Sequence, residues 1–280
     1  MDRVTETRVR RASRGVLSAA ERDVVVREEP LEIRVRGVRI AVIMRTPGDD
    51  DDLVRGFLFT EGVVASGDEI GRVENCAMGA RDDGVDENVV EAVLRSDVDL
   101  DLERFRRNVF ASSSCGVCGK AAIENAVRLA QPLAPAGARC SLATIPSLVD
   151  ALRGAQPTFD LTGGVHAAGL FDAAGALLVA REDVGRHNAV DKAIGFAIGR
   201  ATGRGSSADR VLDRAVALVV SGRVSFEIVQ KAAAARIPLV VAVSAPSSLA
   251  VETARALGIA LVGFVRGATC NVYVETDVLG

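Results

Sequence analysis

Hydrophobic and polar residues alternate over residues 31–35, which places the apolar side chains on one face of a β-strand. A glycine turn at position 37 separates this run from a second apolar run over residues 40–44, and the arrangement predicts a hairpin. Four consecutive aspartates then precede apolar positions at helical spacing and predict a helix that ends near Gly62. We interpret these aspartates as a solvated helix start rather than a metal site. Two more strands are expected within residues 70–104.

The last third of the chain has continuous apolar runs over residues 216–220, 238–243 and 259–265. Helical patterns over residues 225–236, and from residue 248 to about Leu257, separate these runs. Apolar strands without alternation, joined by helices, are typical of parallel strands that are buried on both faces. The pattern therefore predicts an α/β fold with parallel C-terminal strands and crossover helices.

Three regions are expected along the chain. Residues 1–25 are polar, rich in arginine and without a pattern, which favours a flexible basic arm. Residues 26–110 would form a smaller N-terminal α+β subdomain of hairpins and a helix. Residues 111–280 would form the α/β domain.

The composition narrows the classes of function. The chain has 280 residues and a formal charge of −3, so we expect no binding to nucleic acid or to a membrane surface. No stretch is apolar enough to span a membrane, and no signal-peptide core follows the N-terminal arginines. These features favour a cytoplasmic protein. Five cysteines with only one close pair do not resemble a secreted disulfide framework.

The close pair, Cys115 and Cys118, is the sharpest chemical feature of the sequence. It follows three serines, is flanked by glycines and precedes a helix expected over residues 121–130. The free N–H groups of a helix N-terminus, together with the nearby Lys120, stabilise a thiolate. A thiolate on a mobile polar loop suits the uptake of sulfur as a persulfide at one site and its release at another.

Three other interpretations of the cysteine pair are less favoured. A structural zinc site needs four ligands, but Cys76, Cys140 and Cys270 are scattered singly, so no metal is expected. A thioredoxin-like exchanger carries its pair after an early strand, whereas this pair follows about 110 residues of other structure. Two buried, inert cysteines are disfavoured by the flanking serines and glycines.

Lysine and histidine are rare, since 31 of the 34 basic residues are arginine and only two residues are histidine. His166 follows two glycines in residues 162–168, which indicates either backbone closely approached by a ligand or by the cysteine loop, or a simple glycine-rich turn. Residues 181–192 are densely charged and follow a short apolar strand, so we interpret them as an internally paired polar site. This block includes His187, Asp191 and Lys192.

Three loops follow the expected parallel strands. They contain Ser221-Gly222-Arg223, a segment that begins at Ser244, and Phe264-Val265-Arg266-Gly267-Ala268-Thr269. The carboxyl ends of parallel strands point to one crevice, where helix N-termini favour phosphates and a guanidinium can bind them with two hydrogen bonds. An anion-binding crevice and ordinary α/β turns without a ligand both fit this pattern.

Taken together, these ordered motifs resemble the FdhD family of formate dehydrogenase accessory sulfurtransferases. The resemblance extends from about Leu31 to Tyr273. It rests on residues 112–120, 162–168 and 181–192 and on the loops at 221–227 and 244–249.

The resemblance implies a sulfurtransferase that forms a cysteine persulfide. Sulfur would pass from a cysteine desulfurase to the molybdenum (or tungsten) bis-guanine-dinucleotide cofactor, before that cofactor enters the catalytic subunit of formate dehydrogenase. The family further implies a homodimer, a cytidine-deaminase-like α/β fold, and a molybdenum cofactor that is bound as cargo rather than kept as a cofactor of its own.

The resemblance also assigns expected roles to residues. By position, Cys115 matches the persulfide cysteine, Cys118 matches its partner, and Phe264 to Thr269 match the cofactor-binding loop. We expect Ser221, Gly222, Arg223 and Ser244 to help hold the nucleotide ends of the cofactor. Lys120, His166, His187, Asp191 and Lys192 are expected near the transfer site.

Two rival functions can be compared with the sequence. Zinc deaminases need His-x-Glu followed later by Pro-Cys-x-x-Cys, but the glutamate is missing after His166 and the cysteine pair comes earlier and lacks the proline. Deamination is therefore not expected. The remaining alternative is a non-catalytic chaperone that binds the molybdenum cofactor and docks on formate dehydrogenase.

Overall fold

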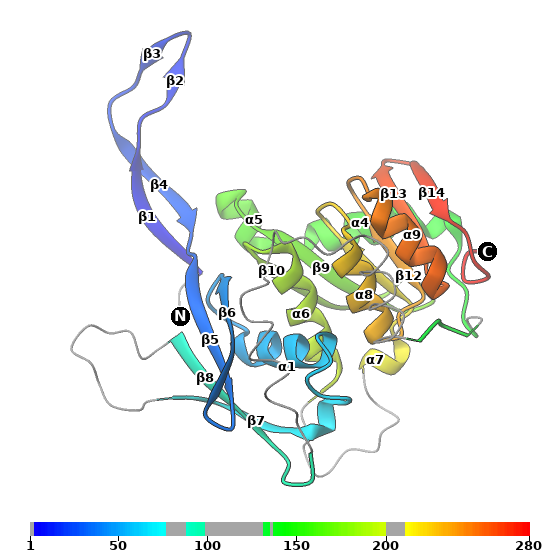
Figure 1. The fold of residues 1–280 in the computed structure, drawn as a ribbon. Coiled ribbons are helices and arrows are strands. Elements are labelled where there is room, and N and C mark those ends of the chain that lie inside the picture. The colour runs from blue at the N-terminus through cyan, green and yellow to red at the C-terminus, as the bar shows by residue number, and fades with distance from the viewer. Residues whose placement is uncertain (1–2, 77–87, 99–130, 135–136, 200–210) are drawn as a thin grey trace.

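The computed structural model describes residues 3–76, 88–98, 131–134, 137–199 and 211–280. They form a larger α/β part, a smaller N-terminal part and a projecting ribbon (Figure 1). The Cys115 and Cys118 pair, Lys120 and the helix expected over residues 121–130 lie outside the described residues, so what was predicted of them stays a prediction.

The larger part is built on a mixed sheet of six strands in the order β10-β9-β11-β12-β13-β14. The strands are β9 (His166–Phe171), β10 (Leu177–Asp183), β11 (Ala217–Val220), β12 (Leu239–Ala242), β13 (Ala260–Arg266) and β14 (Thr269–Val274). β12 pairs in parallel with both β11 and β13, and the other neighbours are antiparallel. The predicted α/β fold with parallel C-terminal strands is confirmed.

Helices cover both faces of this sheet. They are α4 (Ile145–Gly154), α5 (Pro157–Thr162), α6 (Arg186–Ala197), α7 (Val211–Arg214), α8 (Phe226–Ala234) and α9 (Ser248–Leu257), and a short 3-10 turn, η3 (Leu142–Thr144), precedes α4. Leu218 and Val220 of β11 face the core that contains α6, α8 and α9, whereas Ala217 and Val219 face the core that contains α4. Burial on both faces explains why β11 and β12 are continuous apolar runs in the sequence.

The smaller N-terminal part is a sheet of four strands in the order β6-β5-β8-β7. Its elements are β5 (Glu29–Val35), β6 (Val38–Arg45), α1 (Asp50–Thr60), η1 (Gly67–Glu69), β7 (Ile70–Asn75) and β8 (Val89–Leu94). The apolar positions that alternate along β5, Leu31, Ile33 and Val35, are buried in one core with residues of α1. The predicted hairpin, helix and two further strands are all present.

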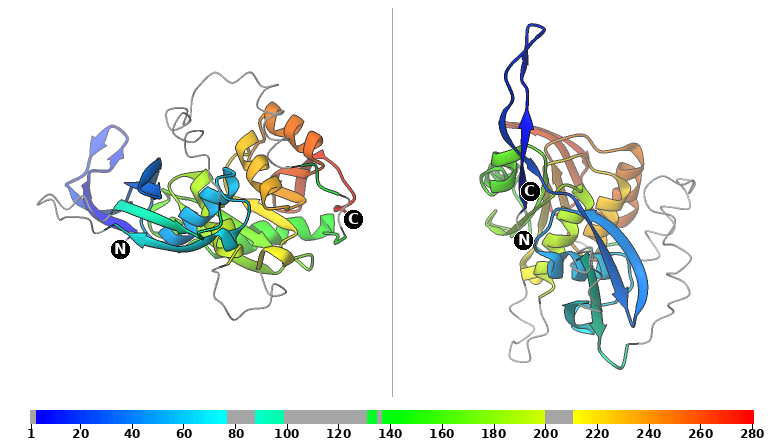
Figure 2. Two further views of the ribbon diagram at one scale, coloured as in Figure 1. Left: turned by 60° about the horizontal axis from the view of Figure 1, so that its bottom comes forward. Right: turned by 90° about the vertical axis from the view of Figure 1, so that its left-hand side faces the viewer.

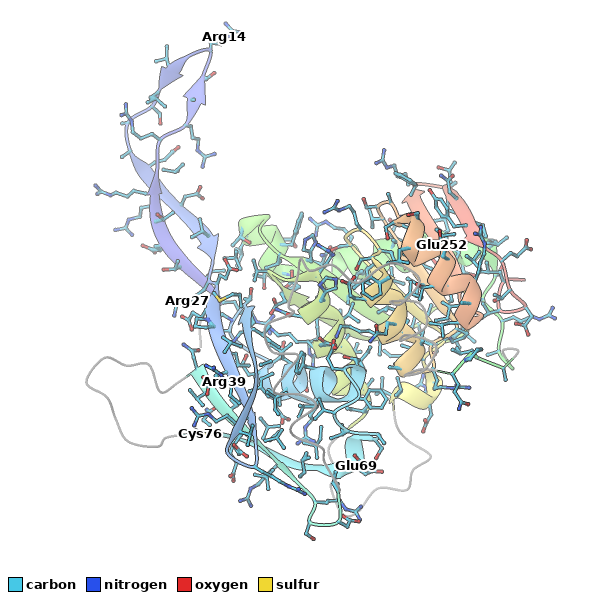
Figure 3. The ribbon with its side chains drawn as sticks, in the orientation of Figure 1. Arg14, Arg27, Arg39, Glu69, Cys76 and Glu252 are labelled. Carbon is cyan, nitrogen blue, oxygen red and sulfur yellow. The ribbon has the colours of Figure 1, made fainter. Side chains whose placement is uncertain are left out.

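Residues 4–26 form a long antiparallel ribbon, where the unpatterned polar sequence predicted a flexible arm. β1 (Val4–Val9) pairs with β4 (Glu21–Val26), and β2 (Ala12–Ser13) pairs with β3 (Val16–Leu17) near the tip. The ribbon projects from the body in all views, and Arg14 lies at its outer end (Figures 2 and 3). Because most side chains of the ribbon are exposed, no buried face imposes an apolar alternation on the sequence.

The two main parts meet where α1 crosses α6 (Figure 1). A Cβ atom on Gly56 would lie 1.8 Å from the carbonyl oxygen of Asp191, and a Cβ atom on Gly195 would lie 1.8 Å from the carbonyl oxygen of Asp52. The helices therefore touch backbone to backbone, and this contact requires glycine on both of them.

A buried polar cluster lies beside the helix crossing. The Lys231 ammonium lies 3.0 Å from Asp191 Oδ1 and donates to Glu61 Oε1 at 2.7 Å and to Thr60 Oγ1 at 2.9 Å. The Lys231 charge lowers the pKa of Glu61, and burial raises the pKa of Asp191 to about 6. Burial alone would lower the pKa of Lys231, but Asp191 and Glu61 outweigh it and raise that pKa. All three groups are therefore mainly charged at neutral pH and join α1, α6 and α8.

The four aspartates at the start of α1 are paired with arginines rather than simply solvated. The pairs are Asp49 with Arg3, Asp50 with Arg45, Asp51 with Arg55 and Asp52 with Arg181. Arg3 belongs to the base of the ribbon and Arg181 to β10, so this helix start connects three regions of the chain.

Candidate functional site

Strand ends from separate sequence motifs meet at one edge of the larger sheet. His166 begins β9 and pairs in register with Asp183 at the end of β10, while Ala168 pairs with Val220 at the end of β11. The next residue, Ser221, accepts a hydrogen bond from the Ala167 N–H at 2.9 Å. We call this region the polar edge and define it as His166, Asp183 to His187, Ser221 to Arg223, Ser225 and Ser244.

The tight packing of His166 depends on a glycine. A Cβ atom on Gly222 would lie 3.1 Å from His166 Nδ1 and 3.8 Å from Arg186 Cβ, so these three residues pack closely. Burial, the Arg186 charge and the Arg223 charge lower the pKa of His166, against an opposite effect of Asp183. His166 is therefore a neutral imidazole at pH 7. Of the two glycines before it, Gly163 has no atom within 4 Å of an added Cβ and Gly164 would meet Val26 at 3.0 Å, so the approach of a ligand or of the cysteine loop to this segment stays a prediction.

His187 is a second neutral imidazole at the polar edge. Its Nε2 lies 3.1 Å from Ser225 Oγ and 3.9 Å from Glu227 Oε2. Burial and the Arg186 charge, with Lys231, lower its pKa to about 4, although Glu227 and Glu61 act in the opposite direction. A neutral ring that contacts a serine hydroxyl can accept or relay a proton at neutral pH.

The lowered pKa of His187 predicts a pH-dependent stability. The folded chain binds the second proton of the His187 imidazole less tightly than the unfolded chain does. The contribution of neutral His187 to the free energy of unfolding is therefore complete above about pH 6.5 and is lost as the pH falls toward 4. Since the His187 side chain is 34% exposed, we expect a loss of about 1–2 kcal/mol rather than the full value of the shift. Urea unfolding of the unaltered chain and of His187→Gln at several pH values measures this loss. The difference between the two proteins isolates His187, because the carboxylates titrate in both. If the free energy of unfolding changed with pH in the same way in both proteins, the prediction would be contradicted.

Asp191 and Lys192 lie in the interior. Lys192 Nζ lies 2.8 Å from Asp183 Oδ2 and donates to the Thr46 carbonyl oxygen at 2.8 Å. Asp183 also accepts hydrogen bonds from Gly185 N and Asn188 Nδ2 at 2.8 and 2.9 Å. The prediction that residues 181–192 form an internally paired polar site is therefore confirmed. These contacts give Asp191 and Lys192 a structural role, and their expected role in transfer stays a prediction.

Most of the loop predicted over residues 264–269 is strand: Phe264 to Arg266 end β13, Gly267 and Ala268 form the turn, and Thr269 begins β14. Phe264 has a φ of 52°, rare for a residue with a side chain, and its N–H donates to the Ser244 carbonyl oxygen at 3.2 Å. Val265 is buried in the core beside α4, so its side chain does not face solvent. Arg266 is exposed, and its carbonyl oxygen accepts a hydrogen bond from Thr269 Oγ1 at 3.0 Å. Of the predicted cofactor loop, Arg266, Gly267, Ala268 and Thr269 are exposed.

The sequence did not indicate Arg186 or Ser225 as site residues. Arg186 begins α6, directly before His187. Its charge lowers the pKa of both His166 and His187. Ser225 is the residue before α8, yet its hydroxyl contacts His187 and does not cap the helix. A serine immediately before a predicted helix is usually interpreted as its cap, so only the fold reveals this contact.

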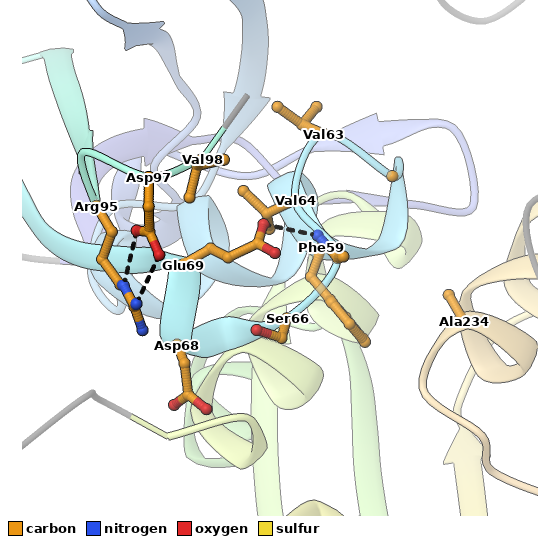
Figure 4. Close-up of a pocket in the computed structure, with 12 residues that line it drawn as sticks. Phe59, Val63, Val64, Ser66, Asp68, Glu69, Arg95, Asp97, Val98 and Ala234 are labelled. Atoms are coloured by element: carbon orange, nitrogen blue, oxygen red, sulfur yellow. Dashed lines mark hydrogen bonds and ion pairs between the residues drawn. The ribbon is translucent and has the colours of Figure 1, made fainter. Parts of the chain in front are cut away.

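A cavity of about 770 Å³ lies away from the polar edge, between the N-terminal part and α8 (Figure 4). Its charged side chains include Arg95 and Asp97, which pair with each other at 2.8 Å, and Glu69, which accepts a hydrogen bond from the Ala65 N–H. None of the residues predicted from the sequence lines it.

The three described cysteines are poor candidates for a reactive thiolate. Cys76, Cys140 and Cys270 are free thiols; Cys76 follows β7, whereas Cys140 and Cys270 both belong to the core beside α4. Cys140 is fully buried, and burial raises its pKa; burial and Glu91 raise the pKa of Cys76. Within the described ranges, no group of three or more histidine, cysteine or acidic residues is placed to hold a metal ion.

The fold defines a mixed α/β protein. Its polar edge, at the carboxyl ends of the parallel strands, carries two neutral histidines, His166 and His187, and two arginines, Arg186 and Arg223. The model of the FdhD/NarQ family matches residues 26–279. The chain belongs to the FdhD/NarQ family, which confirms the resemblance found in the sequence motifs.

Individual relatives agree with this assignment. A sulfur carrier protein FdhD from Mycolicibacterium paratuberculosis is 46% identical over 264 residues, which is 93% of each chain. Another from Streptomyces coelicolor is 46% identical over 280 residues, covering 99% of this chain and 96% of the relative. A crystal structure described as a formate dehydrogenase accessory protein from Desulfotalea psychrophila matches with a TM-score of 0.73 and 25% identity over 99% of this chain and 100% of that chain.

No helix in the described ranges is both long and apolar enough to cross a membrane.

Proposed function

We propose that this chain is a sulfur carrier for the maturation of formate dehydrogenase. It takes sulfur from a cysteine desulfurase on Cys115 and passes it to the molybdenum bis-guanine-dinucleotide cofactor. The observation that carries the proposal is the high identity to proteins named sulfur carrier protein FdhD, over nearly the whole chain. The sequence around Cys115 and Cys118, with its serines, glycines and Lys120, favours an exposed thiolate there, as a carrier needs.

The remaining cysteines support this choice by contrast. Burial keeps the Cys140 thiol away from any partner protein, and the raised pKa of Cys76 disfavours its thiolate at neutral pH. Cys270 lies within β14 of the sheet. None of these three is followed two residues later by a lysine, as Cys118 is by Lys120.

The proposed chemistry uses both cysteines of the pair. The Cys115 thiolate attacks the terminal sulfur of the desulfurase persulfide, and the desulfurase cysteine leaves as a thiolate, so no net oxidation occurs in this step. The Cys118 thiolate then attacks the Cys115 sulfur bonded to the terminal sulfur. A disulfide forms between the two cysteines and sulfide leaves for the metal, and a cellular dithiol reductant restores the pair.

Mass spectrometry tests the first step directly. After incubation with a cysteine desulfurase and cysteine, we expect one additional sulfur atom on the peptide that contains Cys115 and Cys118. Cys115→Ala should remove this added mass, whereas Cys118→Ala should keep it, because uptake needs only Cys115. Cys270→Ala serves as the control and should load sulfur normally. Added sulfur on no cysteine, or on Cys270 alone, would contradict the proposal.

A second candidate function is a non-catalytic chaperone that binds the cofactor and docks on formate dehydrogenase. The accessory-protein description of the similar Desulfotalea psychrophila structure is compatible with it. The two candidates differ in whether Cys115 is needed for an active dehydrogenase.

A further inference from the structure

We propose that the outer end of the N-terminal ribbon docks on a membrane surface that carries anionic lipids. We call residues 8–17 the ribbon tip; its arginines contact lipid phosphates while Val16 and Leu17 enter the boundary between headgroups and acyl chains. The inference goes beyond the proposed function and does not depend on it. Most of the ribbon precedes residues 26–279, which the family model matches, so the family assignment leaves the ribbon unexplained.

The ribbon is held at its base but is uncovered farther out. At the base, a Cβ atom on Gly164 would lie 3.0 Å from a methyl carbon of Val26, so the ribbon touches the body there. Residues 10–22 are all exposed, and the ribbon projects from the body in every view (Figures 1 and 2). A two-stranded ribbon without a covering layer is only marginally stable in water. A surface outside the chain that covers the tip would therefore stabilise it.

The tip carries an excess of positive charge. Residues 7–20 contain four arginines and no acidic residue; the arginines are Arg8, Arg10, Arg11 and Arg14. Arg8 lies directly opposite Arg22 in the pairing of β1 with β4, and like charges in this position destabilise a pair of strands. Glu6 lies 3.8 Å from Arg22, but no carboxylate of the described residues pairs with Arg8. An anionic surface would remove this repulsion.

The turn at the end of the ribbon places an arginine where its backbone is unfavourable. Arg14 and Gly15 have φ values of 48° and 80°, as in a type I′ turn, which favours Asn-Gly. The β5–β6 hairpin has the same arrangement at Arg36 and Gly37, but Arg36 donates to the Val98 carbonyl oxygen at 2.6 Å. Arg14, at the outermost point, has no partner among the described residues (Figure 3). Its guanidinium is therefore available to an anion outside the chain.

The apolar residues of the tip favour a bilayer over a partner protein. Val16 is 72% exposed and Leu17 is 52% exposed. Consecutive residues of a strand point to opposite faces, so a protein that packs on one face of the ribbon would cover only one of them. Insertion of the tip end-on into the headgroup region covers both, while the arginines stay at the level of the phosphates. Residues 3–27 also contain no aromatic side chain, the usual anchor for a partner protein or for single-stranded nucleic acid.

The negative charge of the whole chain does not oppose docking of the tip. The formal charge of −3 predicts no attraction of the chain as a whole to a membrane. The tip, however, extends roughly 30 Å from the base of the ribbon, at about 3.3 Å per residue. The Debye length at physiological ionic strength is only about 8 Å. The charge of the body is therefore screened at the tip, and the arginines there determine the sign of the local potential.

Co-sedimentation of the full chain with vesicles tests the proposal. The vesicles contain either equal parts of phosphatidylglycerol and phosphatidylcholine or phosphatidylcholine alone. We expect binding to the anionic vesicles only, with a lower affinity at higher salt. Replacing Val16 and Leu17 together by serine should weaken binding by at least about 10-fold, because two aliphatic groups no longer enter the apolar boundary. Arg14→Asn should weaken it by about 5-fold, the effect of one arginine near an anionic surface.

Controls change the same kinds of side chain outside the ribbon. Val272→Ser replaces an exposed valine of β14, and Arg39→Gln replaces an exposed arginine of β6 (Figure 3). Both should bind anionic vesicles as the unaltered chain does. Arg14→Asn should melt at the same temperature as the unaltered chain or higher, because asparagine is favoured in this turn, so its weaker binding would not reflect unfolding.

Three results would overturn the proposal: no binding of the unaltered chain to anionic vesicles, equal binding to both kinds of vesicle, or binding that the changes at Val16, Leu17 and Arg14 leave intact. Binding of polyglutamate that depends on the tip, without binding of vesicles, would indicate an acidic protein partner and would also overturn it. None of these measurements needs a sulfur donor. Sulfur loading at Cys115 in the same variants therefore tests the proposed function separately.

Discussion

Cells that depend on this chain should lose nearly all active formate dehydrogenase when Cys115 is replaced by alanine. Alanine removes the only atom that can hold the transferred sulfur in the proposed mechanism, so the expected loss is at least about 1,000-fold, in the range found when a covalent nucleophile is removed. The measurement is formate oxidation in extracts of a strain that lacks its own carrier and expresses the variant. Protein level and melting temperature should not change, because alanine differs from cysteine only by the sulfur.

Two further variants distinguish loss of sulfur uptake from loss of sulfur release and from an unspecific effect. Cys118→Ala should also give inactive dehydrogenase, but with sulfur retained on Cys115, because release would be blocked after uptake. Cys270→Ala should give normal dehydrogenase activity. Fully active, sulfur-containing dehydrogenase with Cys115→Ala would favour the chaperone alternative over the sulfur carrier.

Replacing Gly56 by alanine should destabilise the chain by about 3 kcal/mol, near the upper end of values for overpacked cores. The new methyl group would meet the Asp191 carbonyl oxygen at 1.8 Å, and a backbone atom cannot move away as the end of a side chain can. α1 and α6 would have to separate, which also strains the Lys231 cluster beside them. Differential scanning calorimetry should show a melting temperature lower by about 6–12 °C for a chain of this size.

The reciprocal glycine gives an independent check of the helix crossing. Gly195→Ala should destabilise to a similar extent, because its methyl group would meet the Asp52 carbonyl oxygen. Gly154→Ala is the control: it lies at the end of α4 with no atom within 4 Å of the added group, so helix propensity should leave stability unchanged or slightly higher. Normal melting of both crossing variants would show that the two helices do not touch as described.

Much of the fold could be predicted from local patterns. The buried strand β11, the helix α8 and the strand β12 each have a pattern that depends only on which side chains are covered. The ribbon could not be predicted, because side chains such as Val16, which is 72% exposed, have no apolar face to form a period. Its strands form because β1 pairs with β4, and a pattern within either segment alone does not predict that pairing.

The candidate site was predicted in part. The sequence indicated the histidines, the charged block and the loops after the parallel strands, because unusual residue types at strand ends are visible in any sequence. It did not show that Lys192 and Asp191 pair with groups from other elements, while no carboxylate of the described residues pairs with Arg186. That distinction depends on which carboxylates come within about 3 Å of each cation, and these carboxylates come from distant segments.

The sequence by itself determined the α/β class, the parallel strands and the polar residues that follow them, because these follow from residue type and spacing. Only the tertiary structure decided that Gly56 and Gly195 bring two helices into backbone contact and that the α1 aspartates pair with arginines of three regions. Packing and ion pairing act between residues far apart in the chain, so their outcome is defined only once the elements are placed in space.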